Sequence, residues 1–509
     1  MAATHQGKFE VAEATVSDLQ AAMTAGTTTA LGLVEAYFAR ITAIDKAGPR
    51  LNAVIELNPD APAIADALDK ERQSKGPRGP LHGIPVLLKD NIATGDRMLT
   101  SAGSLAMAGA PAAKDAFLVK QLRDAGVVIL GKTNLSEWAN IRSTRSTSGW
   151  SARGGLTRNP YALDRNTSGS SSGSGAATAA SLAAIAVGTE TDGSITSPAS
   201  LASLVGIKPT LGMVSRAGVI PIAHSQDTAG PMARTVADAA ALLSALAGSD
   251  PQDAATAEAT QRKTDFLKAL DKNALRGKRI GVVRSQFAGQ NDQVATVVQA
   301  ELAVLTAQGA VLVNVAEIPN IAKYGDTELT VLLTELKADL PKYLATYAPT
   351  APVKTLADVI AFNIRHADRE MAHFGQELFI KAQATGDLKS KDYLDALATN
   401  QKYAGKEGID AVLAANKLDA LVAPTGGLPW LTDFINGDNS GASFTAPAAV
   451  AGYPHVTVPA GFVHGLPCGL SFVGPAWSDA ALIGMAYAYE QASKRRRAPT
   501  YPKTVNPAV

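Results

Sequence analysis

Small residues dominate positions 143–175 of this chain, which are dense in Ser, Gly, Thr and Asn and hold few large apolar side chains. A linker of this composition would be flexible. Here the segment runs directly into an Ala-rich stretch at 176–186, which we expect to be helical, and then into a second Gly/Ser/Thr-rich turn at 188–197. Two small-residue turns that flank one helix indicate a built site rather than a tether between domains.

The apolar pattern around this segment predicts alternating helices and strands. Helices are expected at 28–45, 61–75, 115–125 and 480–492. Strands are expected at 51–57, 84–89, 127–130, 279–283, 310–315, 419–424 and 455–459. Strand, helix and strand at this spacing favour an α/β layered architecture. Residues from about 250 to 415 read as a helix-rich region.

Composition excludes several classes of protein. Hydrophobic residues make up 46% of the chain, too many for a disordered protein. The net charge is 47 − 46 = +1, so no overall field attracts nucleic acid or an anionic membrane. A single cysteine, Cys468, excludes an intramolecular disulfide framework and cysteine-rich metal sites. The one dense basic run, 494–497, is expected to be a solvated helix end.

Targeting signals are also sparse. No apolar run reaches the 18 or so residues of a membrane span. The first residues lack the apolar core of a signal peptide, which favours a cytoplasmic location. Neither nucleic acid nor a membrane is therefore expected as a partner.

Two segments match known catalytic sequence patterns, but the residues around them do not have the structure that those patterns require. Residues 126–133 fit the phosphate-loop pattern G-x4-G-K-[ST], but the four intervening residues are an apolar, strand-like run instead of a flexible loop. Residues 169–173 fit the nucleophile-elbow pattern G-x-S-x-G centred on Ser171, but no strand-like run precedes them. A nucleotide-binding protein with a phosphate loop remains a remote alternative.

Several separated motifs resemble the amidase signature family. The first small-residue turn carries Ser170, the second carries Ser194 at a spacing of 194 − 170 = 24, and Lys89 ends the apolar run at 84–88. The resemblance extends from about residue 14 to residue 495. It implies an α/β fold in which a large mixed central sheet is covered by helices on both faces (α/β/α). It also implies a single domain over 1–509, with the helix-rich region at about 250–415 covering the substrate mouth.

The resemblance further implies a Ser-cisSer-Lys triad. Ser194 would be the acyl nucleophile, and Ser170, in a cis peptide, would bridge it to Lys89. A serine hydroxyl needs an adjacent base, and a lysine can serve only if burial lowers its pKa. The implied oxyanion hole is formed by the amides of Thr191, Asp192, Gly193 and Ser194. No metal or cofactor is expected.

Departures from the family pattern bear on the substrate. Asp192 replaces a small residue and Thr196 replaces the usual Arg, which argues against the glutaminase subunits of tRNA-dependent amidotransferases. The segments at 135–140 and 148–155 look most like those of bacterial peptide amidases, which release ammonia from C-terminally amidated peptides. Residues expected near the substrate are Ser171, Trp138, Asn140 and Asp192.

Other functions within the same family remain open. One is a broad amidase for aryl amides, aliphatic amides or carbamates. Another is a glutaminase subunit of a tRNA-dependent amidotransferase, which would need partner chains. The expected ligand is a small-molecule or peptide amide, and the expected state is a monomer or homodimer.

Overall fold

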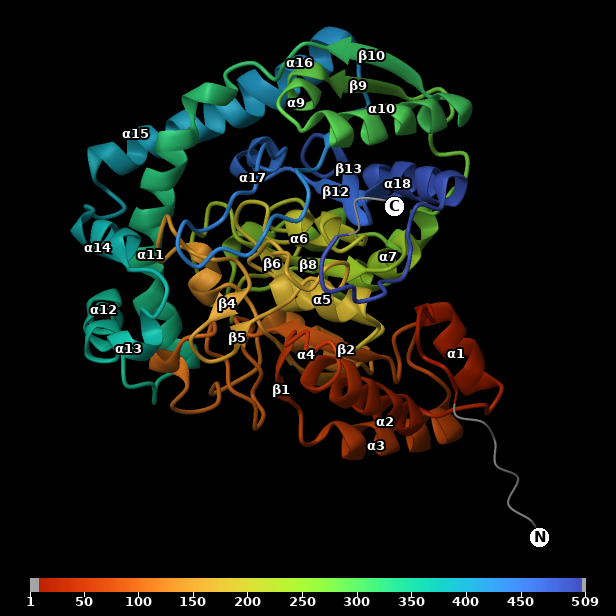
Figure 1. Cartoon of the computed structure of the whole chain (residues 1–509), viewed down its shortest axis with the longest axis vertical. Helices are drawn as coiled ribbons and strands as arrows, with labels where there is room; N and C mark the ends of the chain where they lie inside the picture. The colour runs from red at the N-terminus through yellow and green to blue at the C-terminus, as the bar shows by residue number, and fades with distance from the viewer. Residues whose placement is uncertain (1–8, 506–509) are drawn as a thin grey trace.

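One mixed sheet forms the centre of the protein in the computed structural model, which describes residues 9–505 (Figure 1). Within that range eleven strands pair in the order β1-β3-β2-β6-β8-β7-β12-β13-β11-β9-β10. They are β1 (Val54–Leu57), β2 (Pro85–Lys89), β3 (Val128–Thr133), β6 (Ile185–Glu190), β7 (Val205–Lys208), β8 (Thr228–Ala233), β9 (Arg279–Val283), β10 (Val311–Val315), β11 (Ala420–Pro424), β12 (His455–Val463) and β13 (Leu466–Val473). A separate two-stranded sheet pairs β4 (Trp150–Ser151) with β5 (Gly155–Leu156).

Helices cover both faces of the sheet, as the α/β/α expectation states. They are α1 (Val16–Thr24), α2 (Ala30–Arg40), α3 (Ala61–Lys75), α4 (Phe117–Asp124), α5 (Ser172–Ala179), α6 (Thr196–Ser200), α7 (Val236–Leu246), α8 (Ala259–Arg262), α9 (Arg284–Ala288), α10 (Asp292–Ala307), α11 (Gly325–Tyr347), α12 (Leu356–Arg365), α13 (Ala367–Glu370), α14 (Glu377–Ala384), α15 (Lys391–Asn400), α16 (Asp410–Asn416), α17 (Ala446–Ala451) and α18 (Asp479–Ser493). Short 3-10 or π turns are η1 (Ile41–Lys46), η2 (Leu105–Met107), η3 (Glu137–Asn140), η4 (Ala254–Thr256), η5 (Phe266–Ala269), η6 (Ile321–Lys323) and η7 (Gln401–Ile409).

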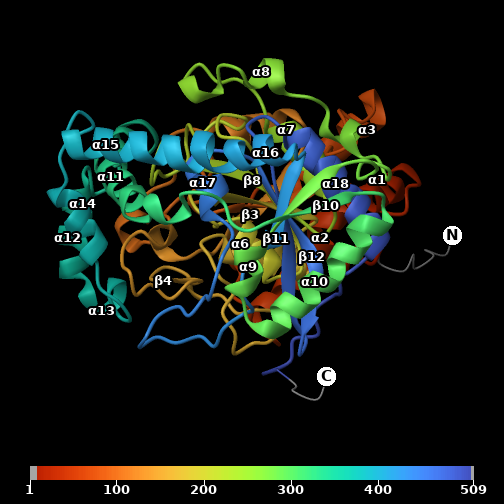
Figure 2. The same ribbon diagram turned by 90° about the horizontal axis from the view of Figure 1, so that it is seen from above.

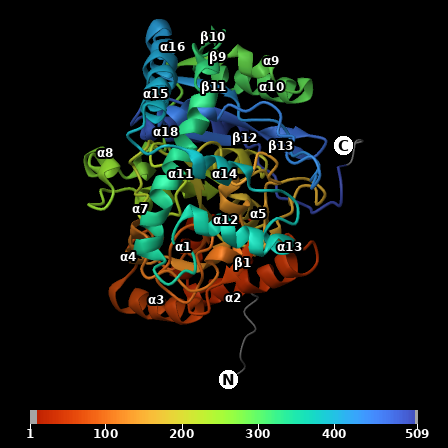
Figure 3. The ribbon, with the colours of Figure 1, turned by 90° about the vertical axis from the view of Figure 1, so that its left-hand side faces the viewer.

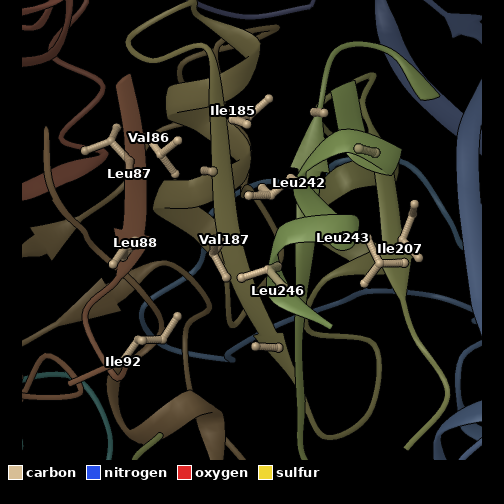
Figure 4. Packing of buried hydrophobic residues seen from close by; sticks show 14 of the residues in the cluster. Val86, Leu87, Leu88, Ile92, Ile185, Val187, Ile207, Leu242, Leu243 and Leu246 are labelled. Atoms are coloured by element: carbon tan, nitrogen blue, oxygen red, sulfur yellow. The ribbon is translucent and has the colours of Figure 1, made fainter. Parts of the chain in front are cut away.

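The neighbouring strands β2 and β6 run parallel through the core. Every residue of both strands is buried, so neither shows the alternation of a strand with one wet face. Leucines of α7 pack against this part of the sheet: Leu246 lies beside Val187 of β6, and Leu243 beside Ile207 of β7 (Figure 4). Each fully buried leucine contributes about 1.5–3 kcal/mol. This packing covers the middle of β6, and the candidate site lies at the end of that strand.

The prediction of a helix at 176–186 is wrong at the C-terminal end of that range. Helix α5 begins earlier, at Ser172, and ends at Ala179. Ser181 then takes a left-handed φ of 54°, and Ile185 already pairs with Val86 of β2. Alanines favour helix locally, but here parallel pairing in the core overrides that preference.

The phosphate-loop pattern lies in a strand, as its apolar residues indicate. Gly131, Lys132 and Thr133 belong to β3, and all three are buried. The Lys132 ammonium donates to the carbonyl of Ile92 at 2.6 Å and to Thr100 Oγ1 at 2.8 Å. Both the backbone and the lysine are therefore committed to the core and cannot cradle a phosphate.

Residues 250–415 contain helices α8–α16 together with strands β9 and β10, which join the edge of the main sheet. Helices α11–α15 stand beside the sheet as a layer of their own (Figures 1 and 3). Seen from above, α8 projects from the opposite side of the molecule from the β12–β13 hairpin (Figure 2). Within residues 9–505 no helix is long and apolar enough to cross a membrane.

The basic run at 494–497 directly follows the end of α18, and Lys494, Arg495 and Arg497 are exposed, as the sequence suggests. Two of its arginines also form ion pairs. Arg495 pairs with Glu301 at 2.8 Å, and Arg496 pairs with Glu13 at 2.8 Å. Arg496 also donates to the carbonyl of Ser203. The run therefore anchors the C-terminal segment against three distant parts of the chain.

Gly173 offers a test of how tightly α5 is packed. A Cβ atom at this position would lie 2.3 Å from the carbonyl oxygen of Ala53 and 2.4 Å from that of Asn134. Both atoms are backbone and cannot move aside easily. We expect Gly173→Ala to lower the free energy of unfolding by at least about 3 kcal/mol, measured by urea denaturation.

The matched control is Gly325→Ala at the start of α11, where a Cβ would meet nothing within 4 Å. This variant should be neutral or slightly stabilised. Equal stabilities of the two variants would contradict the close approach at Gly173.

Candidate active site

Two parallel strands bring the predicted triad residues to one edge of the sheet. Lys89 is the last residue of β2, and Glu190 is the last residue of β6. Ser170 lies just before α5, and Ser194 lies in the turn between β6 and α6. The carboxyl ends of parallel strands are the usual place for a site in an α/β sheet.

Lys89 is fully buried and makes three hydrogen bonds. Its Nζ lies 2.7 Å from Ser170 Oγ, 2.9 Å from Thr189 Oγ1 and 3.2 Å from the carbonyl of Thr189. Burial lowers the pKa of Lys89 to about 7, although the charges of Asp227 and Glu190 act in the opposite direction. A substantial fraction of this amine is therefore neutral near pH 7, as a general base requires.

The two serines differ in exposure. Ser170 is completely buried, whereas Ser194 is 8% exposed. The Gly169–Ser170 peptide is cis, as the resemblance implies. Lys89 bonds to Ser170, but among the described residues no hydrogen bond joins Ser170 to Ser194. The carbonyl of Ser194 accepts from the amide of Ser171 at 3.1 Å, so Ser194 lies next to the buried Lys89–Ser170 pair. Catalytic hydrogen bonds often tighten only when substrate binds.

The turn before α6 leaves a run of backbone amides free. The Glu190 carboxylate accepts from the amide of Ile195 at 2.7 Å and from that of Thr196 at 2.9 Å. The four preceding amides, which are those predicted for the oxyanion hole (Thr191, Asp192, Gly193 and Ser194), have no acceptor within residues 9–505. Glu190 thus fixes the end of the turn while its start is left able to bind an anion.

Asp227 supports the same turn and was not singled out as a site residue from the sequence. Its Oδ1 accepts from Thr191 Oγ1 at 2.6 Å, and its Oδ2 accepts from the amides of Ile222 and Ala223. Burial raises the pKa of Asp227 to about 6, and these hydrogen bonds oppose the rise. Asp227 is 33 residues from Ser194 in the chain, and the fold brings it to the turn through Thr191.

Ser171 and Asp192 both lie at the candidate site, but they differ in how their side-chain oxygens are hydrogen-bonded. The Ser171 hydroxyl donates to the carbonyl of Thr189 at 3.0 Å and accepts from the amide of that residue at 3.2 Å. Asp192 follows Thr191 in the turn, and its Oδ1 is buried without a partner in the described part of the chain. A role of Ser171 in binding substrate stays a prediction.

Trp138 and Asn140 lie in a strained turn next to Ser170. The amide of Ser136 donates to the carbonyl of Ser170 at 3.1 Å, and residues 138–140 all adopt left-handed φ values of 49°, 53° and 73°. Non-glycine residues in this conformation are costly and concentrate at functional sites. Within residues 9–505, Trp138 Nε1 and Asn140 Oδ1 are buried without hydrogen-bond partners. Their contact with substrate stays a prediction.

The loop at 143–155 is held from two directions. Glu377 of α14 accepts from Ser143 Oγ and Thr144 Oγ1, each at 2.9 Å. Asp438, in the long connection between β11 and α17, accepts from the amide of Ser148 at 3.1 Å. Trp150 packs edge-on against Phe374 at 5.2 Å. Segments more than 200 residues away therefore determine the shape of this loop.

Residues 224, 225 and 226 each contact a different acidic side chain on α11. His224 Nδ1 lies 2.6 Å from Asp339, the amide of Ser225 donates to Glu335 at 2.9 Å, and Gln226 donates to Glu328 at 2.9 Å. His224, Glu335 and Asp339 are close enough to hold a metal ion. Their atoms are already paired with each other and with Tyr393, so the contacts act as a clamp between α11 and the segment that carries Asp227.

Asp227→Asn tests the electrostatics of the lysine. The amide oxygen can still accept from the backbone amides of Ile222 and Ala223, and the amide nitrogen can donate to Thr191 Oγ1. The substitution removes a charge that raises the pKa of Lys89. The acidic limb of the kcat/KM profile should therefore move to lower pH, by about one unit. The measurement is ammonia release from pH 5 to pH 9.

Asp326→Asn is the control for that profile, because Asp326 is exposed on α11. Its profile should match that of the wild type. A limb that moves to higher pH in Asp227→Asn would contradict the assigned influence of Asp227 on Lys89.

Known proteins are similar to this chain over most of its length. The family model described as Amidase matches residues 32–483. A probable amidase of Arabidopsis thaliana is 42% identical over 503 residues, covering 97% of this chain and 92% of that protein. The solved structure of native peptide amidase from Stenotrophomonas maltophilia is 53% identical with a TM-score of 0.92, covering 96% of this chain and 99% of that chain. One subunit of the glutamyl-tRNA(Gln) amidotransferase of Halorhodospira halophila is 35% identical over 497 residues, covering 94% of this chain and 96% of that protein.

Proposed function

This chain belongs to the amidase family and is an amidase, and we propose that it hydrolyses the C-terminal amide of peptides to the free acid and ammonia. The observation that carries the proposal is the 53% identity, at a TM-score of 0.92, to a peptide amidase over nearly the whole chain. Identity to the amidotransferase subunit is lower, at 35%. Asp192 and Thr196, which depart from the form expected of that subunit, favour the same choice.

In the proposed mechanism, neutral Lys89 acts as the base. Lys89 accepts the proton of Ser170 as Ser170 accepts that of Ser194, and Ser194 Oγ attacks the amide carbon. The free amides of residues 191–194 stabilise the oxyanion, each such donor contributing about 2.7–4 kcal/mol. The proton then returns through Ser170 to the nitrogen, ammonia leaves, and water hydrolyses the acyl-enzyme by the same relay.

The proposed substrate needs an open side for the peptide and a short closed side for the terminal amide. The loop at 143–155 and the turn at 138–140 supply candidates for the open side. Asn140 Oδ1, which is buried without a partner in the described region, could accept a peptide N–H. Contacts with Ser143 and Ser148 hold this loop in place, so the groove would be formed before the peptide binds.

A matched pair of peptides tests the substrate class. One peptide ends in a primary amide, and the other has the same sequence extended by one residue through an ordinary peptide bond. We expect kcat/KM to be at least about 100-fold higher for the amide, because the extra residue clashes with a closed leaving-group side. Ammonia release and mass spectrometry measure the two rates.

Glutamine and an anilide complete the panel. Comparable cleavage of both peptides, or a strong preference for glutamine or the anilide, would reject peptide C-terminal amides as the substrate. The assignment as an amidase would then stand without the finer one.

A further inference from the structure

Four polar side chains that the proposed mechanism does not use converge beside the nucleophile turn. Asp192 belongs to the turn itself. Gln226 belongs to the segment at 224–226 that is bonded to α11, and Tyr324 and Glu328 lie at the start of α11. Gln226 Nε2 donates to the carbonyl of Thr191 at 3.3 Å and to Glu328 Oε1 at 2.9 Å. Tyr324 lies one helical turn before Glu328, whose backbone amide donates to the carbonyl of Tyr324 at 2.7 Å. Burial raises the pKa of Tyr324, and the charges of Asp192 and Glu328 add to the rise.

Three atoms of this cluster lack partners. Asp192 Oδ1, Gln226 Oε1 and the Tyr324 hydroxyl are buried without a hydrogen bond within residues 9–505. Gln226 is 2% exposed and Tyr324 is 1% exposed. The amide of Gln226 is oriented by two acceptors, so its nitrogen faces them and its oxygen remains free. Two of the three unpaired atoms can only accept, so the missing partner is a hydrogen-bond donor.

The charges around the cluster favour a cationic donor. Burial raises the pKa of Asp192, and Glu190 adds to that rise while Thr445 and Lys208 oppose it. Burial and the charge of Asp192 raise the pKa of Glu328 as well, against the hydrogen bond from Gln226. The charge of Asp192 thus disfavours ionisation of Glu328, and a cation beside both carboxylates would stabilise both charged forms.

We propose that Asp192, Gln226, Tyr324 and Glu328 form a subsite for a primary ammonium or amine nitrogen next to Ser194. The inference rests on the proposed function, since it takes Ser194 as the nucleophile. An ammonium group carries three or more N–H donors and can satisfy the unpaired acceptors together. Its source is either the nitrogen released from the scissile amide or the free α-ammonium of a short acyl group, and both share this chemistry.

Glu328→Gln tests the subsite, because it removes the charge while keeping the size of the side chain. Asp326→Asn is the matched control in the same turn of α11, with an exposed side chain. The assays use whichever primary amides the wild type hydrolyses, so peptide specificity is not at issue. Tyr324→Phe, which deletes only the unpaired hydroxyl, replaces Glu328→Gln if that variant does not fold.

The first arm measures the leaving nitrogen. Hydroxylamine competes with water for the acyl-enzyme: a C–N bond forms, the bond from carbon to Ser194 Oγ breaks, and a proton from nitrogen returns to that oxygen. The products are a hydroxamate and free enzyme. Glu328→Gln should lower the ratio of hydroxamate to acid at least tenfold, and Asp326→Asn should leave it unchanged.

The second arm measures the acyl ammonium. It compares KM for a dipeptide amide with a free α-amino group against that for its N-acetyl form. If the subsite holds this ammonium, Glu328→Gln raises KM at least tenfold for the free form only. A change in either arm supports the subsite and identifies its source, whereas folded Glu328→Gln that behaves as wild type in both overturns it.

A binding measurement separates this inference from the proposed function. Calorimetry on the Ser194→Ala protein compares methylammonium chloride with tetramethylammonium chloride, which has no N–H donors. Binding of methylammonium alone, lost in Ser194→Ala/Glu328→Gln, is expected even if no tested amide is hydrolysed. Equal behaviour of the two salts overturns the subsite whatever the substrate proves to be.

Discussion

Ser194→Ala is expected to lower kcat by at least about 10⁴-fold while leaving the fold intact. The hydroxyl is the proposed nucleophile, and no other described serine is placed to replace it. Ser170 is fully buried against Lys89, and the Ser171 hydroxyl is bound at both ends by the backbone of Thr189. Alanine fits the partly exposed turn without a clash, so the melting temperature should change little.

Ammonia release measures the loss, and a serine-reactive phosphonate followed by peptide mapping locates the nucleophile. Ser74→Ala serves as the control, since its hydroxyl bonds only to carbonyls of its own helix. It should retain wild-type kcat and the label. A label on Ser171, with activity surviving in Ser194→Ala, would restore the nucleophile-elbow interpretation.

Lys89→Arg is expected to be as inactive as Lys89→Ala, with kcat lowered at least about 10³-fold in both. Burial makes the amine of Lys89 a base near pH 7, but a guanidinium stays protonated at any working pH. The larger group must also fit where Lys89 is completely enclosed. An active Lys89→Arg enzyme would show that the residue supplies charge instead of accepting a proton.

The pH dependence of the wild-type enzyme should show the ionisation of the same lysine. The base acts only when neutral, so kcat/KM should fall tenfold per pH unit as pH drops below the Lys89 pKa of about 7. Glu490 is also buried, and burial raises its pKa to about 7. It accepts from the amide of Val236, which follows the end of β8 that pairs with the start of β6, opposite the end of β6 that leads to Ser194. Glu490→Gln should therefore leave the acidic limb in place, and a limb that disappears with it would reassign the titration.

Local patterns predicted much of the central sheet and its helices. The expected helix at 61–75 and the strand at 279–283 coincide with α3 and β9. Strands β6, β7, β8 and β13 were not anticipated, and β6 occupies residues assigned to the end of a helix and the start of a turn. Gly230 and Pro231 lie within β8, and both residue types are unfavourable inside a strand, so the sequence does not indicate one there. Pairing with β6 stabilises β8 in the folded protein.

The candidate site could be predicted where its residues lie in sequence motifs. Lys89, Ser170 and Ser194 fall in such motifs, and the structure places Lys89 and Ser170 in contact. Glu328 could not be found in this way, because it is 136 residues from Asp192 in a helix with no distinctive sequence. Only the tertiary contact through Gln226 relates the two.

The clamp between residues 224–226 and α11 has a consequence for engineering. Exchanging the 250–415 segment between relatives is an attractive way to graft new specificity onto a constant catalytic half. In this protein that graft would also replace the three acids that hold the segment carrying Asp227, and through Thr191 it would disturb the turn itself. A chimaera that keeps Glu328, Glu335 and Asp339 should retain its catalytic activity. One that omits them would have a new pocket, but its catalytic turn would be held in place by fewer contacts.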